Sequence, residues 1–353
     1  MKRIPTGLST VLAGVLAVSL TACTLTGDDS DADSGGGKKV VLVTHDSFAA
    51  PQELLDKFKK DTGITIDVRK VGDAGALTNQ LVLTKDKPIG DLAYGVDNTF
   101  ASRALDEKVF AEYKSPEAGK GPQRYQIDDT GRLTAVDVGD VCLNIDPAAF
   151  EARNLPEPKS YADLTKTDYR DMLVVEDPAT SSPGLAFLLG TIAELGEDGW
   201  REYWVALKGV GMKVDSGWEE AYTQDFSGSS GQGDRPIVVS YASSPAAEVG
   251  DDGKPTTKAL LDTCFRQVEY AGVLNGAKDA DSAKKVLDFL LSEKFQAAMP
   301  EQMYVYPARE GVALPDAWET AAPQPKKAAT LPPADIQQNR ERWIDEWRGL
   351  VQG

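Results

Sequence analysis

Residues 39–71 read KVVLVTHDSFAAPQELLDKFKKDTGITIDVRKV. The apolar run at 39–43 predicts a buried strand. Residues 51–63 place their leucines and a phenylalanine on one helical face and end at a glycine, which predicts a helix. Residues 64–71 alternate apolar and polar side chains, the pattern of a half-buried strand. This order of strand, helix and strand predicts an α/β sheet with parallel strands.

The same alternation of strands and helices continues along the chain. Further strands are expected at 91–97, 134–145, 172–178, the start of 236–249 and 265–274. Further helices are expected at 76–85, 98–109, from 185 to about 208, at 279–302 and at 335–352. Two α/β lobes joined by extended crossover segments fit this order of elements.

Polar or small residues follow five of the expected strands. They lie at 44–49, 72–76, 97–100, 177–184 and 241–245. Ligands of open α/β sheets bind outside the carboxyl ends of the strands. The loops therefore predict a cleft site carried by a rigid scaffold.

The charge of the chain excludes one large class of partners. Its 353 residues include 38 Lys and Arg against 55 Asp and Glu, which gives a formal net charge of −17. A protein that binds nucleic acid or an anionic membrane surface needs a basic face. We therefore expect no nucleic-acid partner.

The N-terminal residues have the pattern of an export signal. Two positive residues precede the apolar run at 11–20, which is too short to span a bilayer. The following LTAC at 20–23 resembles the bacterial lipobox, which implies cleavage before Cys23 and attachment of lipid to it. A plain secretory signal with a chance cysteine is the alternative. Residues 24–39 are polar, acidic and rich in Gly and Ser, as in a disordered tether.

The cysteines and the single histidine limit the chemistry of the chain. With Cys23 assigned to lipid, Cys142 and Cys264 remain, and two cysteines of an exported protein usually form one disulfide. Two buried free thiols are the alternative. We expect no metal site, because zinc and haem sites need more histidines or cysteines than a chain with only His45 supplies.

Little in the sequence supports catalysis. A Ser-His-Asp hydrolase needs a histidine base, and no G-x-S-x-G turn accompanies any serine. The chain has no G-x-x-x-x-G-K-[ST] loop, and no G-x-G-x-x-G fingerprint follows its first strand. We therefore expect a binding protein without a cofactor rather than an enzyme.

Six stretches together resemble one family. They read THDSFA (44–49), GVDNTF (95–100), DPATSSPGL (177–185), SGWEEAY (216–222), VVSYASSPA (238–246) and YVYPA (304–308). In this order they resemble the substrate-binding proteins of thiamine ABC transporters, over about residues 40–350. The resemblance implies an α/β, two-lobe periplasmic-binding-protein type II fold with hinge crossover segments. It also implies thiamine or its phosphate esters as ligand and an ABC transporter permease as partner.

The resemblance further implies a set of ligand-binding residues. They are Asp73, Ala74, Ser181, Ser182, Trp218, Tyr241, Ala242, Ser243, Ser244, His45, Asp46, Asp97 and Tyr304. Three of these positions depart from the family pattern. Ala74 stands where the family has glycine, Ser182 where it has threonine, and Tyr304 where relatives can carry tryptophan.

The chemistry of thiamine suggests how these residues are used. Its cationic thiazolium ring favours aromatic faces and carboxylates, and its hydroxyethyl or phosphate arm favours hydroxyls at a helix N-terminus. We therefore expect Ser181 and Ser182 to meet the arm, and Trp218 and Tyr241 to lie near the rings. A stacked His45 would have to be neutral, because imidazolium repels thiazolium.

Several of these residues also have a structural alternative. Trp218 could belong to the core, and Asp46 could cap a turn instead of pairing with the ligand amine. For Asp97 and Asn98, helix capping and ligand contact are about equally expected. Three further aromatic residues are expected to be structural: Tyr306, and Trp343 with Trp347 on the last helix.

The expected organisation follows from the resemblance and the element order. It comprises a lipoprotein signal peptide at 1–22, a disordered tether at 23–38, lobe one at 39–137 and 265–315, lobe two at 138–264 and a C-terminal helical segment at 316–353. The protein is expected to be a monomer, exported and held at the cell membrane by its lipid.

Two other functions remain open on the same fold. A ferric-ion or other small-ion receptor is the first, although the adjacent tyrosine pair of iron binders is missing and Tyr304 and Tyr306 are separated by one residue. A thiaminase-like transferase is the second, and it would need Cys142 as a free nucleophile. A disulfide between Cys142 and Cys264 would remove that second possibility.

Overall fold

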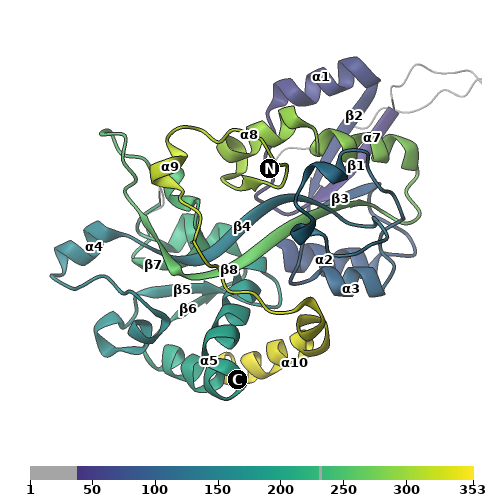
Figure 1. The fold of residues 1–353 in the computed structure, drawn as a ribbon. Coiled ribbons are helices and arrows are strands. Elements are labelled where there is room, and N and C mark those ends of the chain that lie inside the picture. Colours follow the sequence, from purple (N-terminus) through teal and green to yellow (C-terminus); the bar gives the residue numbers. More distant parts are fainter. Residues whose placement is uncertain (1–37, 230–232) are drawn as a thin grey trace, which may run out of the picture. The chain divides into compact units, whose positions relative to one another are not determined.

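The computed structural model describes residues 38–229 and 233–353 (Figure 1). The expected signal peptide, the expected lipidation site Cys23 and most of the expected tether lie outside the described residues. Within the described part of the chain, no helix combines the length and apolarity needed to cross a bilayer.

The described strands form one connected sheet in the order β2-β1-β3-β8-β4-β7-β5-β6, with β9 paired to β4. Their bounds are β1 (Lys38–Thr44), β2 (Ile64–Lys70), β3 (Leu92–Asp97), β4 (Thr134–Ile145), β5 (Leu173–Glu176), β6 (Lys213–Asp215), β7 (Ile237–Tyr241), β8 (Lys258–Val273) and β9 (Tyr306–Pro307). Strands β1, β2 and β3 pair in parallel, and so do β5, β6 and β7. Each parallel group is the sheet of one lobe.

Strands β4 and β8 join the two lobes. They are antiparallel over their length, from the pair Thr134 and Ala271 to the pair Ile145 and Lys258, and Figure 1 shows them running together between the two groups of strands. The sheet is therefore mixed, which corrects the expectation of parallel strands. The reason is topological, because β4 carries the chain from lobe one to lobe two and β8 carries it back.

The crossover strands are also joined covalently. The sulfur atoms of Cys142 in β4 and Cys264 in β8 form a disulfide, as the sequence led us to expect. Both residues are buried, and they lie where the register of the two strands shifts between Val141 and Leu143. The expected lobe limits at 137 and 264 fall inside these strands and stay a prediction.

Helices cover the sheet of each lobe. Lobe one carries α1 (Gln52–Thr62), α2 (Ala74–Leu83), α3 (Ala101–Asp106), α7 (Ala280–Leu290) and α8 (Glu293–Met303), and lobe two carries α4 (Pro147–Ala152), α5 (Ser182–Gly209) and α6 (Trp218–Glu220). The single helix expected at 279–302 is in fact two. The break follows from a capping signal, because the Ser292 hydroxyl accepts a hydrogen bond from the Phe295 amide and starts a new helix.

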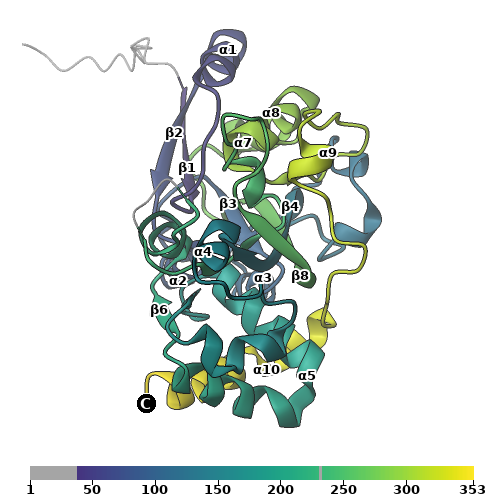
Figure 2. The same cartoon turned by 90° about the vertical axis from the view of Figure 1, so that its left-hand side faces the viewer.

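The C-terminal segment contains α9 (Trp318–Ala321) and α10 (Pro333–Val351). Both views show α10 alongside α5 (Figures 1 and 2). Trp347 is fully buried and meets Trp204 of α5 edge to face, with ring centroids 5.5 Å apart. Trp343 is buried in the same core, so the expectation that both residues pack the last helix against a lobe is confirmed.

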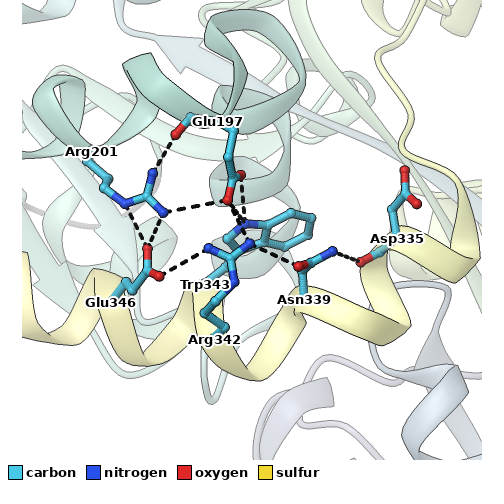
Figure 3. A network of polar contacts seen from close by, with 7 residues as sticks. All are labelled: Glu197, Arg201, Asp335, Asn339, Arg342, Trp343 and Glu346. Atoms are coloured by element: carbon cyan, nitrogen blue, oxygen red, sulfur yellow. Dashed lines mark hydrogen bonds and ion pairs between the residues drawn. The ribbon is translucent and has the colours of Figure 1, made fainter.

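A polar network at the edge of this contact fixes the position of α10 on α5 (Figure 3). Glu197 accepts hydrogen bonds from the Arg342 guanidinium at 2.6 Å and from the Trp343 indole at 3.0 Å. Arg201 donates to Glu346 at 2.7 Å. Networks of this kind add more than isolated surface ion pairs, because each side chain is already held by another partner.

Candidate functional site

A cavity of about 450 Å³ lies where strand ends of the two lobes meet. This volume falls in the range of small-molecule sites. Four of the five polar loops expected at strand ends reach its wall, through His45, Asp46 and Ser47, Gly72 and Asp73, Thr180, and Tyr241 with Ser244. The rest of the cavity wall consists of residues 216–220, residues 303–305 and single positions of neighbouring elements. The fifth loop, at 97–100, does not contribute.

An aromatic pair forms one part of the wall. The Trp218 ring stacks on Tyr222, with centroids 4.8 Å apart and planes at 16°. The chain runs from α6 directly into a π-helical turn at Ala221–Asp225, which sets the two rings over each other. The Trp218 indole donates to the Ser240 hydroxyl at 2.8 Å, and Tyr241 lies 6.2 Å away. Trp218 is therefore held in place with part of its ring open to the cavity.

Tyr304 follows the end of α8 in the left-handed backbone conformation, with φ 53°. This conformation is unusual for a residue other than glycine and is enriched at binding sites. Its carbonyl accepts a hydrogen bond from the Ser243 hydroxyl of lobe two at 2.5 Å. Tyr304 thus lines the cavity, while Ser243 ties it to the other lobe.

A buried polar cluster lies beneath His45. The His45 Nε2 atom is 3.4 Å from the Glu269 carboxylate. The Tyr94 hydroxyl donates to Glu269 at 3.1 Å and also to Asp137. His45, Tyr94 and Glu269 line the cavity, and Asp137 lies behind them. Glu269 is a cavity residue that the sequence reasoning missed.

The carboxylates around His45 shift its pKa. Burial alone would lower the pKa of His45, but Glu269, with help from Asp73 and Asp46, outweighs it and raises the pKa above its usual value. This direction opposes the requirement that a His45 stacked on a cationic ring be neutral. Glu269 lessens the conflict with a cationic ligand, because its carboxylate offsets the imidazolium charge. Burial tends to raise the pKa of Glu269, and its interactions with His45 more than reverse this.

Gly95 allows the His45 ring to take this position. Gly95 has a φ of +105° within β3, and a Cβ atom there would lie 2.2 Å from His45 Cδ2. Any other residue would displace the imidazole and would also strain the backbone. The glycine of the quoted stretch GVDNTF therefore supports the floor of the cavity.

Asp73 connects the two lobes. Its carboxylate caps α2 of its own lobe by accepting from the Ala74 amide at 2.6 Å. The same carboxylate accepts from two backbone amides of lobe two, Ser182 at 3.2 Å and Trp218 at 2.9 Å. One side chain therefore links the start of α2 to two segments of lobe two, the start of α5 and the start of α6.

Comparison with known proteins agrees with this geometry. A family model described as bacterial extracellular solute-binding protein matches residues 87–339. The chain belongs to this family. It is 30% identical over 324 residues to the thiamine-binding periplasmic protein of Brucella abortus. The matched region covers 88% of this chain and 91% of that protein.

Solved structures extend the likeness to the fold. A periplasmic thiamin binding protein superposes with a TM-score of 0.79 and 26% identity, covering 89% of this chain and 96% of that one. Iron-bound HitA from Pseudomonas aeruginosa gives a TM-score of 0.68 at 19% identity, covering 89% and 99% of the two chains. The chain therefore has the two-lobe α/β fold of the periplasmic binding proteins, as expected.

In this solute-binding protein the two serines of DPATSSPG do not face the cavity. The Ser181 hydroxyl caps α5 by accepting from the Gly184 amide at 3.3 Å. The Ser182 hydroxyl donates to the Asp97 carboxylate and accepts from the side-chain amide of Gln267 at 2.5 Å. Both residues are fully buried and absent from the cavity wall, which corrects the expectation that their hydroxyls point into the cleft.

Other predicted binding residues also lie behind the wall. Ala74, Asp97, Ala242 and Ser243 are buried and do not line the cavity. The backbone amides of Ala74 and Ala242 are taken, by Asp73 and by the Asp140 carbonyl respectively. Any contact of these residues with a ligand is therefore indirect in this conformation.

Asp46 and Ser244 lie on the wall and also hold loops in place. Asp46 accepts from the Gly72 amide at 2.9 Å, and the Ser244 hydroxyl accepts from the Tyr241 amide at 3.1 Å. Asp46 therefore holds the loop at Gly72 and also lies on the cavity wall. Tyr306, by contrast, is away from the cavity and donates to the Ala322 carbonyl, as expected of a structural residue.

Asp97 has a structural part in this solute-binding protein. Its carboxylate accepts from the amides of Thr99 and Phe100 at 3.1 and 3.2 Å, and from the Ser182 hydroxyl of the other lobe. The neighbouring Asn98 bonds to the backbone of β8. Asp97 therefore holds the turn before α3, whose N-cap is Phe100 without a side-chain cap, so neither helix capping nor a place on the cavity wall is seen for Asp97 or Asn98.

Asp97 also makes stability depend on pH. Burial raises the pKa of Asp97 to about 6, even though hydrogen bonds from Ser182 and Thr99 lower it. Because the pKa of Asp97 is higher in the folded than in the unfolded protein, its protonated carboxyl contributes to the unfolding free energy. This contribution is complete below about pH 4 and is lost as the pH rises through about 6. We expect Asp97→Asn to gain in unfolding free energy relative to the wild type between pH 4 and 7, by up to about 3 kcal/mol.

Urea unfolding at several pH values measures this difference. The exposed Asp86, which forms no ion pair within the described residues, provides the matched control Asp86→Asn. The unfolding free energy of this control should change with pH in the same way as that of the wild type between pH 4 and 7. A constant offset between Asp97→Asn and the wild type at every pH would contradict the assignment.

The two alternative functions meet different obstacles. The sulfur of Cys142, on which a transferase would depend, is bonded to Cys264 and buried. For the small-ion receptor, no group of three or more His, Cys, Asp or Glu within residues 38–229 and 233–353 is placed to hold a metal ion. The likeness to HitA concerns the fold alone.

Proposed function

We propose that the protein is an extracytoplasmic receptor that captures thiamine between its lobes and delivers it to an ABC transporter permease. The observation that carries the proposal is the wall of the cavity, where a stacked aromatic pair and several carboxylates face the same space. The 30% identity to a thiamine-binding periplasmic protein supports the choice of ligand.

The chemistry of the wall suits a flat cation. The half-buried Trp218 presents an indole face, and aromatic faces attract cations, most strongly when both are shielded from water. Glu269 provides a carboxylate at the floor of the cavity, and Asp46 and Asp73 add two more at its side. A flat ring system with one fixed positive charge can stack on the indole and can also interact with the carboxylates.

Delivery requires that the lobes open and close. The hydrogen bonds of Asp73 to Ser182 and Trp218 join the lobes in the conformation described here. We propose that the ligand favours this closed state, because the stacked tryptophan belongs to lobe two and the floor carboxylate lies at the other lobe. The lobes would part around the crossover strands β4 and β8.

The anchoring of the receptor follows from the N-terminal sequence. The LTAC stretch at 20–23 supports lipid attachment at Cys23, and residues 24–38 would then tether the lobes to the membrane surface. We propose the lobe limits 39–137 with 265–315 and 138–264 for the same protein, acting as a monomer without enzymatic activity.

Calorimetric titration of the purified protein with thiamine tests the proposal. We expect saturable binding in the submillimolar range or tighter, accompanied by a change in tryptophan fluorescence. Choline is a useful control, since it carries a fixed positive charge but no aromatic ring and should bind more weakly. Absence of both heat and fluorescence change would contradict the function. So would coloured binding of ferric ion that a chelator reverses.

A further inference from the structure

The floor of the cavity holds one histidine among acidic side chains. The side chains of His45 and Glu269 are only 12% and 9% exposed, and the Nε2 atom of His45 lies 3.4 Å from the Glu269 carboxylate. The Tyr94 ring lies beside the imidazole, with centroids 5.5 Å apart. Among the described residues of the cavity wall, none is Lys or Arg. His45 is therefore the counter-charge that this part of the chain provides for Glu269.

A second carboxyl group lies behind this pair. Asp137 of β4 is the register partner of Glu269 on β8, and the Tyr94 hydroxyl bonds to both. The Oδ1 atom of Asp137 is buried and has no hydrogen-bond partner among the described residues, which disfavours the ionised form. Burial and the neighbouring Glu269 raise the pKa of Asp137 well above its usual value. The negative charge of the two carboxyl groups therefore resides on Glu269.

The other titratable side chains around His45 and Glu269 are acidic or phenolic. They are Asp46 of the same loop, Asp73 at the start of α2, Tyr94 and Asp97 in β3, Asp137 in β4 and Tyr241 in β7. Burial holds the pKa of both tyrosines well above its usual value, so they stay neutral. The carboxylates favour imidazolium. Without a ligand, His45 is thus the group of this cluster that carries a positive charge near pH 7.

A cation in the cavity competes with the proton of His45. The stacked Trp218 and Tyr222 face the same space as the cluster, so a bound cationic ring lies close to the imidazole. A positive charge at short range in a partly dry site disfavours imidazolium, because like charges repel there more strongly than in water. The thiazolium charge is permanent, whereas His45 can lose its charge. The proton of His45 is therefore the charge that leaves.

We propose that binding of the thiamine cation expels the proton of His45, so that the receptor takes up its ligand in exchange for a proton. This proposal rests on thiamine being the ligand. The ring N–H proton passes to solvent, His45 becomes a neutral aromatic ring, and Glu269 stays ionised opposite the thiazolium. The net charge of the floor is the same before and after the exchange. Affinity should therefore rise with pH until His45 is neutral in the free protein.

Nuclear magnetic resonance of the wild type tests the exchange directly. His45 is the only histidine of the chain, so protein made without a histidine tag and labelled with ¹⁵N-histidine gives the signals of one imidazole. At pH 7 we expect nitrogen shifts of the protonated ring in the free protein and of the neutral ring after saturation with thiamine. An imidazole that stays protonated in the saturated protein would overturn the proposal.

Calorimetric titration between pH 6 and 8 measures the exchange independently. We expect the thiamine affinity of the wild type to rise with pH, by at most about tenfold per pH unit, and then to level off. Titrations at pH 7 in two phosphate-free buffers of different ionisation enthalpy give the number of protons released, because each buffer takes up a proton with its own heat. Equal heats in the two buffers would contradict the exchange.

Two variants locate the proton. His45→Gln keeps a polar side chain but has no proton to lose, so proton release should disappear and affinity should not change with pH over this range. The matched control Asp137→Asn removes the neighbouring titratable group, leaves His45 and Glu269 in place, and should retain the release. Release that persists in His45→Gln, or that is lost in Asp137→Asn, would overturn the assignment to His45.

Failure of the exchange and failure of the receptor give different results. Thiamine binding without proton release would overturn the exchange and leave the thiamine receptor standing. Absence of thiamine binding throughout pH 6 to 8 would overturn the receptor and the exchange with it. The resonance measurement needs only the wild type, so it decides the question even where a variant is unstable.

Discussion

Replacing Trp218 by alanine should weaken thiamine binding by about 1–3 kcal/mol, the usual contribution of an aromatic face stacked on a cationic or heterocyclic ring. The indole is held for this contact by Tyr222 at 4.8 Å and by a hydrogen bond to Ser240. Calorimetry on the variant measures the loss directly. Because Trp218 also stacks on Tyr222 and donates to Ser240, its removal should lower stability as well, and the unfolding midpoint is needed beside the affinity.

A second variant separates stacking from support of the loop. Trp218→Phe keeps an aromatic face but loses the hydrogen bond to Ser240, and it should retain more affinity than Trp218→Ala. The unfolding midpoint of both variants is recorded alongside, so that a general loss of structure is recognised. Unchanged thiamine affinity in Trp218→Ala would return this residue to a purely structural part.

Much of the fold could be predicted because its signals are local. The periodicity of 51–63 and 64–71 gave α1 and β2 within a residue or so of their ends. The direction of β8 could not be predicted, because alternation with period two is the same in parallel and antiparallel strands. Its first half at 258–264 was missed as well, since charged Lys258 and Asp262 interrupt the apolar pattern there.

The site was predictable in its loops but not in every side chain. Polar residues after strand ends pointed to the right place, because strand ends of one sheet meet. Whether a serine hydroxyl faces the cavity or the protein interior depends on partners far away in the sequence. Ser182 points into the interior because it bonds to Asp97 and Gln267. Glu269 gave only one signal, a carboxylate between the apolar Val268 and Tyr270, and its partner His45 is 224 positions away in the chain.

Removing the disulfide should have the largest effect on stability. The double variant Cys142→Ala/Cys264→Ala opens a link between residues separated by 122 positions. A cross-link that closes a loop of this size restricts the unfolded chain strongly, and the loss of a native disulfide typically costs about 2–5 kcal/mol. We therefore expect urea unfolding to show a fall of this size in the unfolding free energy.

The same variant tests what the disulfide does for the crossover strands. Neither cysteine lines the cavity, so thiamine affinity should stay close to that of the wild type under conditions where the variant is folded. A large loss of affinity would mean instead that the link also sets the geometry of the lobes, because it joins β4 to β8 where their register shifts. An unfolding free energy equal to that of the wild type would contradict the presence of the disulfide. A thiol count on the unreduced wild-type protein checks the disulfide independently. In that count only Cys23 should react, and only if it carries no lipid.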